Sequence, residues 1–337
     1  MIVRVLTGLT AVPFLLGAAA SPGERQHVAF RFEDPAVNEA SALVATRDDL
    51  FATTNDSGDT GRVFTVDRRG RTVGVTHWAD HPVDVEALTD AGDGAVWVGD
   101  IGDNRAVRDS VQVARIPIGR GDRTVRPTVY NLVYPDGAHD AETLLCDRST
   151  GRLYVATKVW AGGLLYAAPK HLVAGGPNRL TPVASVLPIA TDGAFFPDGR
   201  HLVIRGYLSA VVYDWPSMRK VASLALPQQP QGEGIAVAPS GTVYVSSEGL
   251  HSDVLRVPLS ARLGELVTPS ASMSSSPPSS PPSSPSSPST APSRPPVATD
   301  APTAEETTEH RSWWPWVLGG LVGLGALGVL LRSLRPR

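Results

Sequence analysis

The chain has 337 residues, of which 19% are charged, and its 33 acidic residues slightly outnumber its 30 lysines and arginines. This near balance, without a basic stripe, disfavours nucleic acid as a partner. The single cysteine, Cys146, excludes an intramolecular disulfide, and its place in an apolar strand predicts a small buried hydrophobe.

The N-terminus has the three-part pattern of a secretory signal peptide. Arg4 precedes an apolar stretch at residues 5–16, and small residues at 18–20 would form the cleavage site. An uncleaved membrane anchor is the alternative, although the stretch is short and contains Pro13. We therefore predict that residues 1–20 are a signal peptide and that the remaining chain is exported.

Five segments between residues 38 and 266 share one pattern, in which a carboxylate is followed by a short apolar run, a Gly or Asp turn and further β-rich runs. Their opening acids are spaced 47, 56, 50 and 41 residues apart, and these acids are Glu39, Glu86, Glu142, Asp192 and Glu233. Periods of this length mark repeat architectures. We predict an all-β fold, a β-propeller ectodomain at residues 27–266 with four-stranded blades; five are counted, and irregular spacing could hide a sixth.

The last repeat needs an outer strand from elsewhere, because it runs into a Ser/Pro tract first. Residues 27–32 form a strand pattern without a repeat of its own. The simplest closure lends this strand to the last blade, which removes the open sheet edges that favour aggregation.

A propeller places two sets of loops on one face: those that lead into each blade, and those between its second and third strands. The opening acids lie in the first set. The second set holds Asp56, Asp59, Asp100, Asp103, Lys158, Arg205 and Glu248. We predict that both sets meet at the mouth of the central channel, with the ligand-binding residues Glu39, Glu86, Asp192, Glu233, Lys158, Arg205 and Glu248.

Two of these loops contain a D-x-G-D turn, at residues 56–59 and 100–103. Such turns bring carboxylates and backbone carbonyls together, which is the environment that Ca²⁺ prefers. Asp and Gly are also simply good turn formers, so a structural use is equally open. The metal-ligand candidates are Asp56, Asp59, Asp100 and Asp103.

The opening acids repeat a D-x-E pattern, as Asp84-Val85-Glu86 and Asp140-Ala141-Glu142. Carboxylates that face one narrow channel repel each other, and a cation, Lys158 and Arg205, backbone N–H groups or protonation would relieve this. Structural capping, binding of a metal or cationic ligand, and acid-base catalysis all remain open. For catalysis the candidates are Glu142 and His139, although a surface-loop histidine is the simpler interpretation of His139.

The C-terminal part predicts a tethered protein. Residues 267–310 are nearly all Ser, Pro, Thr, Ala or acidic, which predicts a disordered stalk. Residues 313–331, from Trp313 to Leu331, contain no charge and predict a single transmembrane helix, and the basic residues at 332–337 predict a cytoplasmic tail. The expected location is the cell membrane, with the propeller outside.

The segments D-V-E-A-L-T with V-W-V-G-D-I-G-D-N, and G-E-G-I-A-V with V-Y-V-S-S-E-G, resemble blades of secreted NHL-like and phytase-like β-propellers. In the phytase-like families a carboxylate mouth binds Ca²⁺, and metal-activated water cleaves phosphate esters. The resemblance implies such roles for Asp56, Asp59, Glu86, Asp100, Asp103, Glu142, Glu233 and Glu248, with Lys158 and Arg205 available for an anion. It departs from the family in having five repeats instead of six.

Two functions follow from these patterns. The first is a surface-tethered propeller that binds a ligand or partner at its acid-rich mouth with a divalent cation, without catalysis. The second is a Ca²⁺-dependent extracellular hydrolase of phosphate esters or lactones.

Overall fold

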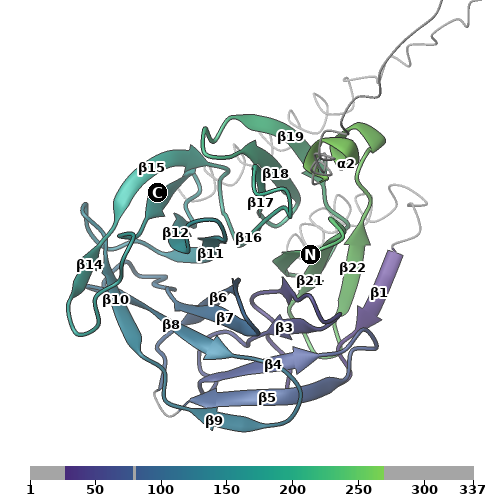
Figure 1. Cartoon of the computed structure of the whole chain (residues 1–337), viewed down its shortest axis with the longest axis horizontal. Coiled ribbons are helices and arrows are strands. Elements are labelled where there is room, and N and C mark those ends of the chain that lie inside the picture. Colours follow the sequence, from purple (N-terminus) through teal and green to yellow (C-terminus); the bar gives the residue numbers. More distant parts are fainter. Residues whose placement is uncertain (1–26, 79–80, 269–337) are drawn as a thin grey trace, which may run out of the picture. The chain divides into compact units, whose positions relative to one another are not determined.

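The structure, a computed structural model, describes residues 27–78 and 81–268 and is a β-propeller of five blades (Figure 1). The predicted all-β class and the count of five repeats are confirmed. The predicted signal peptide, transmembrane segment and tail lie outside the described residues, as does the stalk from residue 269 onwards. Within the described part of the chain, no helix has the length and apolar character that crossing a membrane requires.

Each blade is an antiparallel sheet whose first strand lies nearest the channel, as Figure 1 shows. The first two blades are β2 (Val44–Ala45), β3 (Phe51–Thr53), β4 (Arg62–Val66), β5 (Thr72–Trp78), and β6 (Val85–Gly92), β7 (Ala95–Asp100), β8 (Val111–Pro117), β10 (Val129–Val133). The next two are β11 (Ala141–Asp147), β12 (Arg152–Thr157), β13 (Gly163–Ala167), β15 (Thr181–Val186), and β16 (Asp192–Phe195), β17 (His201–Arg205), β18 (Ser209–Asp214), β19 (Lys220–Ala225). The fifth is β20 (Gly232–Val237), β21 (Val243–Ser247) and β22 (Asp253–Val257), completed by β1 (His27–Arg31).

The ring closes as predicted, because β1 pairs antiparallel with β22 at the outer edge of the fifth blade. Arg31 Nε lies 2.7 Å from Asp253 Oδ1 across this pair, and the ring of Phe30 packs on Phe51 of the first blade. The N-terminal strand therefore joins the first and last blades.

Two short strands were not predicted from the sequence. β9 (Arg123–Val125) belongs to the connection after β8, yet it pairs in parallel with β5 of the preceding blade. β14 (Pro177–Arg179) likewise pairs with β10 of the preceding blade. Each strand covers an outer edge that would otherwise be open, which protects the ring from edge-to-edge association.

The apolar core consists of five clusters, and each fills the space between two neighbouring blades. Cys146 lies in the cluster between the second and third blades, is buried, and is free, as predicted for a small hydrophobe. Burial raises the pKa of its thiol to about 11, so the thiolate form is scarce at neutral pH.

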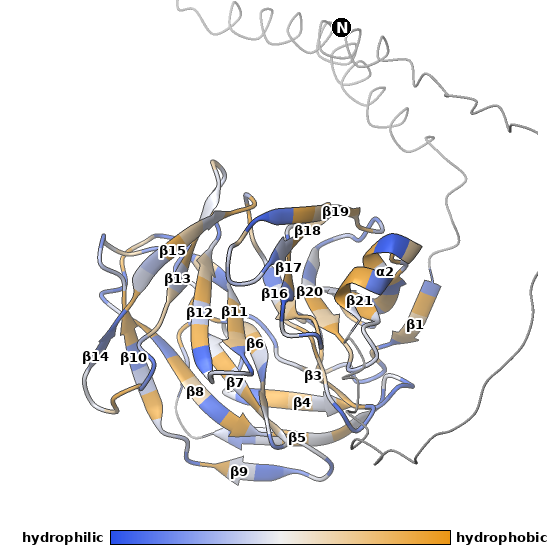
Figure 2. Cartoon of the chain, turned by 45° about the horizontal axis from the view of Figure 1, so that its top comes forward, coloured by the Kyte–Doolittle hydropathy of each residue, from blue (hydrophilic) through white to orange (hydrophobic). Residues whose placement is uncertain are grey.

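The helix α2 (Ala261–Val267) follows the last blade and has both apolar and polar residues (Figure 2). Ser260 caps its N-terminus by accepting a hydrogen bond from the N–H of Leu263. Leu263 and Val267 are buried against the cluster between the fourth and fifth blades. The predicted stalk, residues 267–310, overlaps this helix at Val267.

Gly70 makes the tightest backbone approach in the ring closure, and we expect Gly70→Ala to destabilise the fold by about 2–3 kcal/mol. Its φ is +82°, and a Cβ there would lie 1.6 Å from the carbonyl oxygen of Arg31 at the end of β1. Gly58→Ala is the matched control, since Gly58 has φ +87° but no atom within 4 Å of an added Cβ. Urea unfolding would compare both variants with the wild type, and equal losses would contradict the role of the close approach.

Candidate functional site

An extra residue at the start of the inner strand turns the opening acid of several blades towards the channel. The pairing register shifts by one residue around Glu86 in β6, around Glu142 in β11, and between Gly232 and Ile235 in β20, which contains Glu233. β-Bulges of this kind re-aim a side chain at functional sites. Glu86, Glu142 and Glu233 are all about 95% buried at this mouth.

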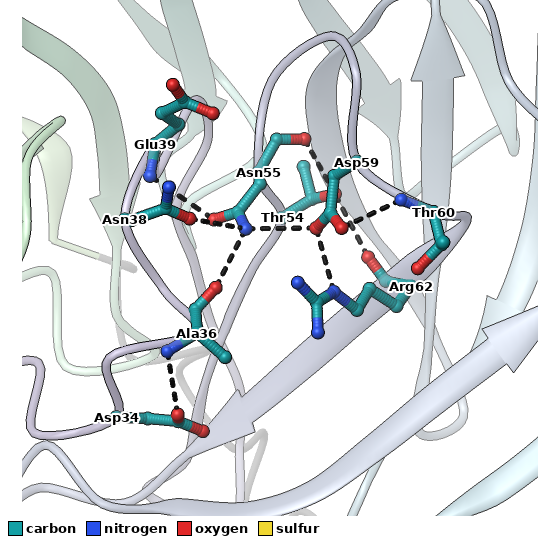
Figure 3. A network of polar contacts seen from close by, with 9 residues as sticks. All are labelled: Asp34, Ala36, Asn38, Glu39, Thr54, Asn55, Asp59, Thr60 and Arg62. Carbon is teal, nitrogen blue, oxygen red and sulfur yellow. Dashed lines mark hydrogen bonds and ion pairs between the residues drawn. The ribbon is translucent and has the colours of Figure 1, made fainter.

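In the first blade the opening acid does not take the position that the comparison of the five repeats predicts. Its inner strand pairs Ala40 with Asn55 and Val44 with Ala52, which places the extra residue after Ala40. Ser41 therefore takes the position that Glu86 and Glu142 take in their blades, and its hydroxyl donates a 2.6 Å hydrogen bond to Glu86 Oε2. Glu39 lies outside this position and is exposed, and Figure 3 shows its carboxylate pointing away from the neighbouring Asn55 network.

The fourth blade has a regular inner strand, and its acid is fully enclosed. Asp192 accepts hydrogen bonds from the N–H groups of Leu43 in the first blade, Ile235 in the fifth blade and Gly193. Burial raises its pKa well above the ordinary value, against the opposing effect of these hydrogen bonds. Asp192 thus ties three blades together at the channel and presents no surface to a ligand.

Arg205 is also fully buried, beside Asp192. Its guanidinium donates hydrogen bonds to the carbonyls of Gly206, Gly234, Ser246 and Tyr207 and to the side chain of Gln229. Burial lowers its pKa to about 10, so it remains charged at neutral pH. Its donors are occupied within the protein, which differs from the expected role as an anion-binding residue.

Asp56, Asp84 and Glu86 form the tightest acidic cluster, with one oxygen from each lying within 4.8 Å of the others. Asp56 comes from the loop between β3 and β4, whereas Asp84 and Glu86 come from the start of the second blade. Two local features let these three carboxylates come close together: the bulge at Glu86 and the glycine at position 102. A Cβ on Gly102 would lie 2.4 Å from the carboxylate carbon of Asp84.

The two D-x-G-D turns therefore have different uses. Gly58 adopts a left-handed backbone conformation in open space, whereas Gly102 is required for close packing against Asp84 and Glu86. Of the four predicted metal ligands, only Asp56 belongs to the cluster.

The other three predicted metal ligands brace their own loops. Asp59 accepts hydrogen bonds from Asn55 and Arg62, as Figure 3 shows. Asp100 accepts from the N–H groups of Val83 and Asp84 and pairs with Arg108 at 2.8 Å, while Asp103 accepts from the N–H of Arg108. Asp100 therefore supports the cluster indirectly, because its hydrogen bonds to the backbone at Val83 and Asp84 hold the backbone of Asp84 in place.

Several carboxylates interact electrostatically at this end of the channel. We call six of them the acid mouth: Asp56, Asp84, Glu86, Glu142, Glu233 and Glu248. Burial, then repulsion by Glu142 and Asp56, raises the pKa of Glu86 to about 10. Burial, then repulsion by Asp56, raises the pKa of Asp84 to about 7. The pKa of Glu248 rises to about 7 through burial and Glu233.

Lys158 is the basic residue that enters the acid mouth. It forms an ion pair with Glu142 Oε1 and lies 5.5 Å from the ring centre of Tyr207. Burial and Glu233 raise the pKa of Glu142 to about 8 even though Lys158 opposes the shift. The pKa of Lys158 itself is raised above its ordinary value, because the attraction of Glu142 outweighs the opposing effect of burial.

Two buried oxygens of the acid mouth have no hydrogen-bond partner: Asp84 Oδ1 and Glu142 Oε2. Buried polar atoms are normally paired, so such atoms indicate a missing partner. The three clustered side chains offer only carboxylate oxygens as metal ligands, and such oxygens suit a hard cation such as Ca²⁺ or Mg²⁺ better than a soft transition metal. The residues present therefore fit a divalent cation at Asp56, Asp84 and Glu86.

His139, the histidine proposed as a base or metal ligand, has other partners. Its Nε2 lies 3.1 Å from Asp136 Oδ1 and 3.2 Å from the hydroxyl of Tyr166, and its ring packs edge-on against Tyr134. Tyr166 also donates a 2.7 Å hydrogen bond to Asp136. These contacts explain the position of His139 as part of a loop network between blades.

Asp84 belongs to the D-x-E pattern but is not among the site residues predicted from the sequence. The sequence feature that could have identified it is its position two residues before Glu86, because the bulge at Glu86 lets both side chains reach the mouth. Its neighbour in the cluster, Asp56, lies 28 positions earlier, and only the ring geometry shows that the two meet.

Without added metal, we expect stability to fall as the pH rises from 5 to 9. The native pKa values of Asp84 and Glu86 lie near 7 and 10, above the ordinary values of about 4, so the folded state holds protons that the unfolded state releases. Their stabilising contribution is complete below pH 4 and is lost as the pH rises through the native values. Groups with a lowered pKa, such as Asp147, change their protonation below pH 5 and therefore do not affect this trend.

Urea midpoints in chelator at pH 5, 7 and 9 would measure this trend. Asp84→Asn with Glu86→Gln should flatten it, because neither amide titrates. A midpoint that rises between pH 5 and 8 in the wild type would contradict the assignment.

The other end of the channel holds a cavity of about 210 Å³. All five inner strands line it, with Leu43, Leu88, Cys146 and Phe195 among the apolar residues and Arg148 at its edge. Arg148 is already paired with Asp90. None of the predicted site residues lies in this cavity, so the acid mouth and the cavity are separate features.

No protein-family model matches the sequence, and no curated protein does. A solved structure described as a "putative oxidoreductase (glucose dehydrogenase)" from Thermus thermophilus is similar in fold, at 14% identity and a TM-score of 0.43. The match covers 70% of this chain and all of that one.

Proposed function

We propose that this protein is a cell-surface binding module that holds a divalent cation, of the Ca²⁺ class, at Asp56, Asp84 and Glu86 and takes its ligand or partner at the acid mouth. The observation that carries the proposal is the two buried oxygens without a hydrogen-bond partner, Asp84 Oδ1 within this cluster and Glu142 Oε2 elsewhere in the acid mouth. A cation would satisfy the cluster and offset the repulsion that raises its pKa values.

The tether is the part of the proposal that comes from the sequence. A signal pattern at residues 1–20 and an uncharged run at residues 313–331 support export and anchoring. The Ser/Pro-rich residues 267–310 would act as the stalk between the propeller and the membrane.

A hydrolase of phosphate esters or lactones is the second candidate, and Glu142 is the observation that favours it. Its pKa of about 8 allows it to accept or donate a proton near neutral pH. Its free oxygen is buried within the acid mouth, and Lys158 on the other oxygen could also contact an anionic substrate. The bound cation would supply an activated water and charge neutralisation.

One experiment separates the two functions. The purified full chain is titrated with CaCl₂ and MgCl₂ by calorimetry, and hydrolysis of p-nitrophenyl phosphate and of a simple lactone is followed with Ca²⁺ and with chelator. Saturable cation binding without turnover supports the binding module. Cation-dependent turnover that Glu142→Gln abolishes supports the hydrolase, and absence of both contradicts the proposal and leaves the acids as structural groups.

A further inference from the structure

The face that contains the acid mouth also has an unusual set of exposed apolar side chains, which we call the apolar rim: Val83, Val107, Val159, Trp160, Leu208 and Leu250. Their exposed fractions run from 38% for Val159 to 84% for Trp160. Exposed apolar residues are common singly, but a set that gathers on one face marks an interaction site.

The topology places the whole rim on this face. Val83 lies in the loop that leads into the second blade, and the others lie in loops between second and third strands, one loop in each of the second to fifth blades. Both kinds of loop belong to the end of the propeller where the acid mouth opens. Among the described residues, the other exposed large apolar side chains are Val28, Val173, Val183 and Leu266, on outer strands, a peripheral loop and α2.

Each rim residue lies within two positions of a residue that belongs to the acid mouth, contacts it, or supports the loop behind it, as Val159 does directly after Lys158. Val83 precedes Asp84, and Val107 precedes Arg108, which bonds Asp100 and the carbonyl of Gly102. Trp160 lies two residues after Lys158, Leu208 follows Tyr207, and Leu250 lies two residues after Glu248. The rim therefore surrounds the mouth over four blades.

The first blade leaves this rim open. Its loop presents Ser57, Gly58 and Thr60, which are exposed and not large and apolar, beside Asp56. The surface is thus a horseshoe of apolar side chains around a centre of six carboxylates whose only entering lysine, among the described residues, is already paired with Glu142.

We infer that this face docks a protein partner that inserts a lysine or arginine side chain into the acid mouth while its neighbouring apolar residues pack on the rim. A rim that spans loops of four blades is too wide for a small molecule to cover. A central charge that its partner complements, enclosed by aromatic and aliphatic contacts, is the usual anatomy of a protein interface, and an exposed tryptophan is a typical anchor.

An anionic membrane surface fits this face less well, because its negative potential would repel the acid mouth. The inference goes beyond the proposed function, since the apolar contacts and the basic group do not require the cation.

A random dodecapeptide library displayed on phage is the probe, selected against the full chain in phosphatidylcholine nanodiscs. We expect enriched peptides to carry Lys or Arg beside large apolar residues. Trp160→Ser with Leu208→Ser and Leu250→Ser should weaken a selected synthetic peptide at least tenfold, and so should Lys or Arg→Ala in the peptide. The matched control, Val28→Ser with Val173→Ser and Val183→Ser, removes exposed apolar residues elsewhere and should change the affinity less than twofold.

Failure of this inference has its own signature. It is overturned if no peptide is enriched, if the peptides lack basic residues, or if the rim variant binds them as tightly as the wild type. Rim-dependent capture of phosphatidylglycerol nanodiscs in place of peptides would also overturn it in favour of a membrane surface. Calorimetry with CaCl₂ on the rim variant tests the cation site separately, since no rim residue belongs to the cluster.

Discussion

Asp84→Asn combined with Glu86→Gln should abolish the stabilisation of this protein by Ca²⁺. A ligand that binds only the folded state stabilises it by about 4 kcal/mol at a concentration one thousand times its Kd. For a domain of this size, 1 kcal/mol corresponds to about 2–4 °C in Tm, so the wild type should gain roughly 8–16 °C. The double variant should gain nothing, because amides replace two of the three clustered carboxylates.

The same variant has a second expected signature in chelator. Without a cation, the wild type keeps repelling and partly protonated acids in a buried site. Removing two of them should make the metal-free variant as stable as, or more stable than, the metal-free wild type at pH 8. A structural capping role predicts the opposite, since loss of caps lowers stability in every buffer.

Asp48→Asn with Glu265→Gln is the matched control for charge, because both residues are exposed and lie outside the acid mouth. This control should keep the full response to Ca²⁺. Thermal melts of all three proteins with CaCl₂ and with chelator would decide the matter, and an undiminished response in the cluster variant would refute the cation site.

The repeats were visible in the sequence because each blade restarts with the same chemistry. The acid, the apolar run and the turn recur at Glu86 and Glu142 in the same register as in the structure. The closing strand was also predictable, since residues 27–32 had no other partner. β9 and β14 were not, because three-residue strands paired with another blade's edge have no periodicity of their own.

The location of the acid mouth could be predicted from the sequence, but the residues that form it could not all be identified. Comparison of the repeats placed Glu39 with the other acids, whereas the strand pairing gives that position to Ser41, two residues later, and a slip of this kind leaves no trace in composition. Arg205 and Lys158 look alike in the sequence as single cations at equivalent turns. Only burial separates them: Arg205 serves backbone carbonyls inside the ring, while Lys158 reaches a carboxylate at the mouth.

Arg205→Met should destabilise the folded protein by about 3–5 kcal/mol, the cost of leaving buried charges without their partner. Methionine fills a similar volume but cannot donate, so the carbonyls of Gly234 and Ser246 would lose their hydrogen bonds. Asp192 and Glu233 would also lose the nearby positive charge that favours their ionised forms. Urea unfolding at pH 7 in chelator would measure the loss.

Arg200→Met is the control for this substitution, because Arg200 directly precedes the same strand, β17, and its side chain is 62% exposed. Surface substitutions of this kind usually change stability by less than about 0.5 kcal/mol. Asp192→Asn should be intermediate: an amide oxygen can keep the hydrogen bonds from Leu43 and Ile235, but the NH₂ group cannot accept from Gly193. A loss below about 1 kcal/mol for Arg205→Met would mean that the ring does not depend on this arginine. The closure of the first, fourth and fifth blades around the channel would then have to rest on their apolar clusters alone.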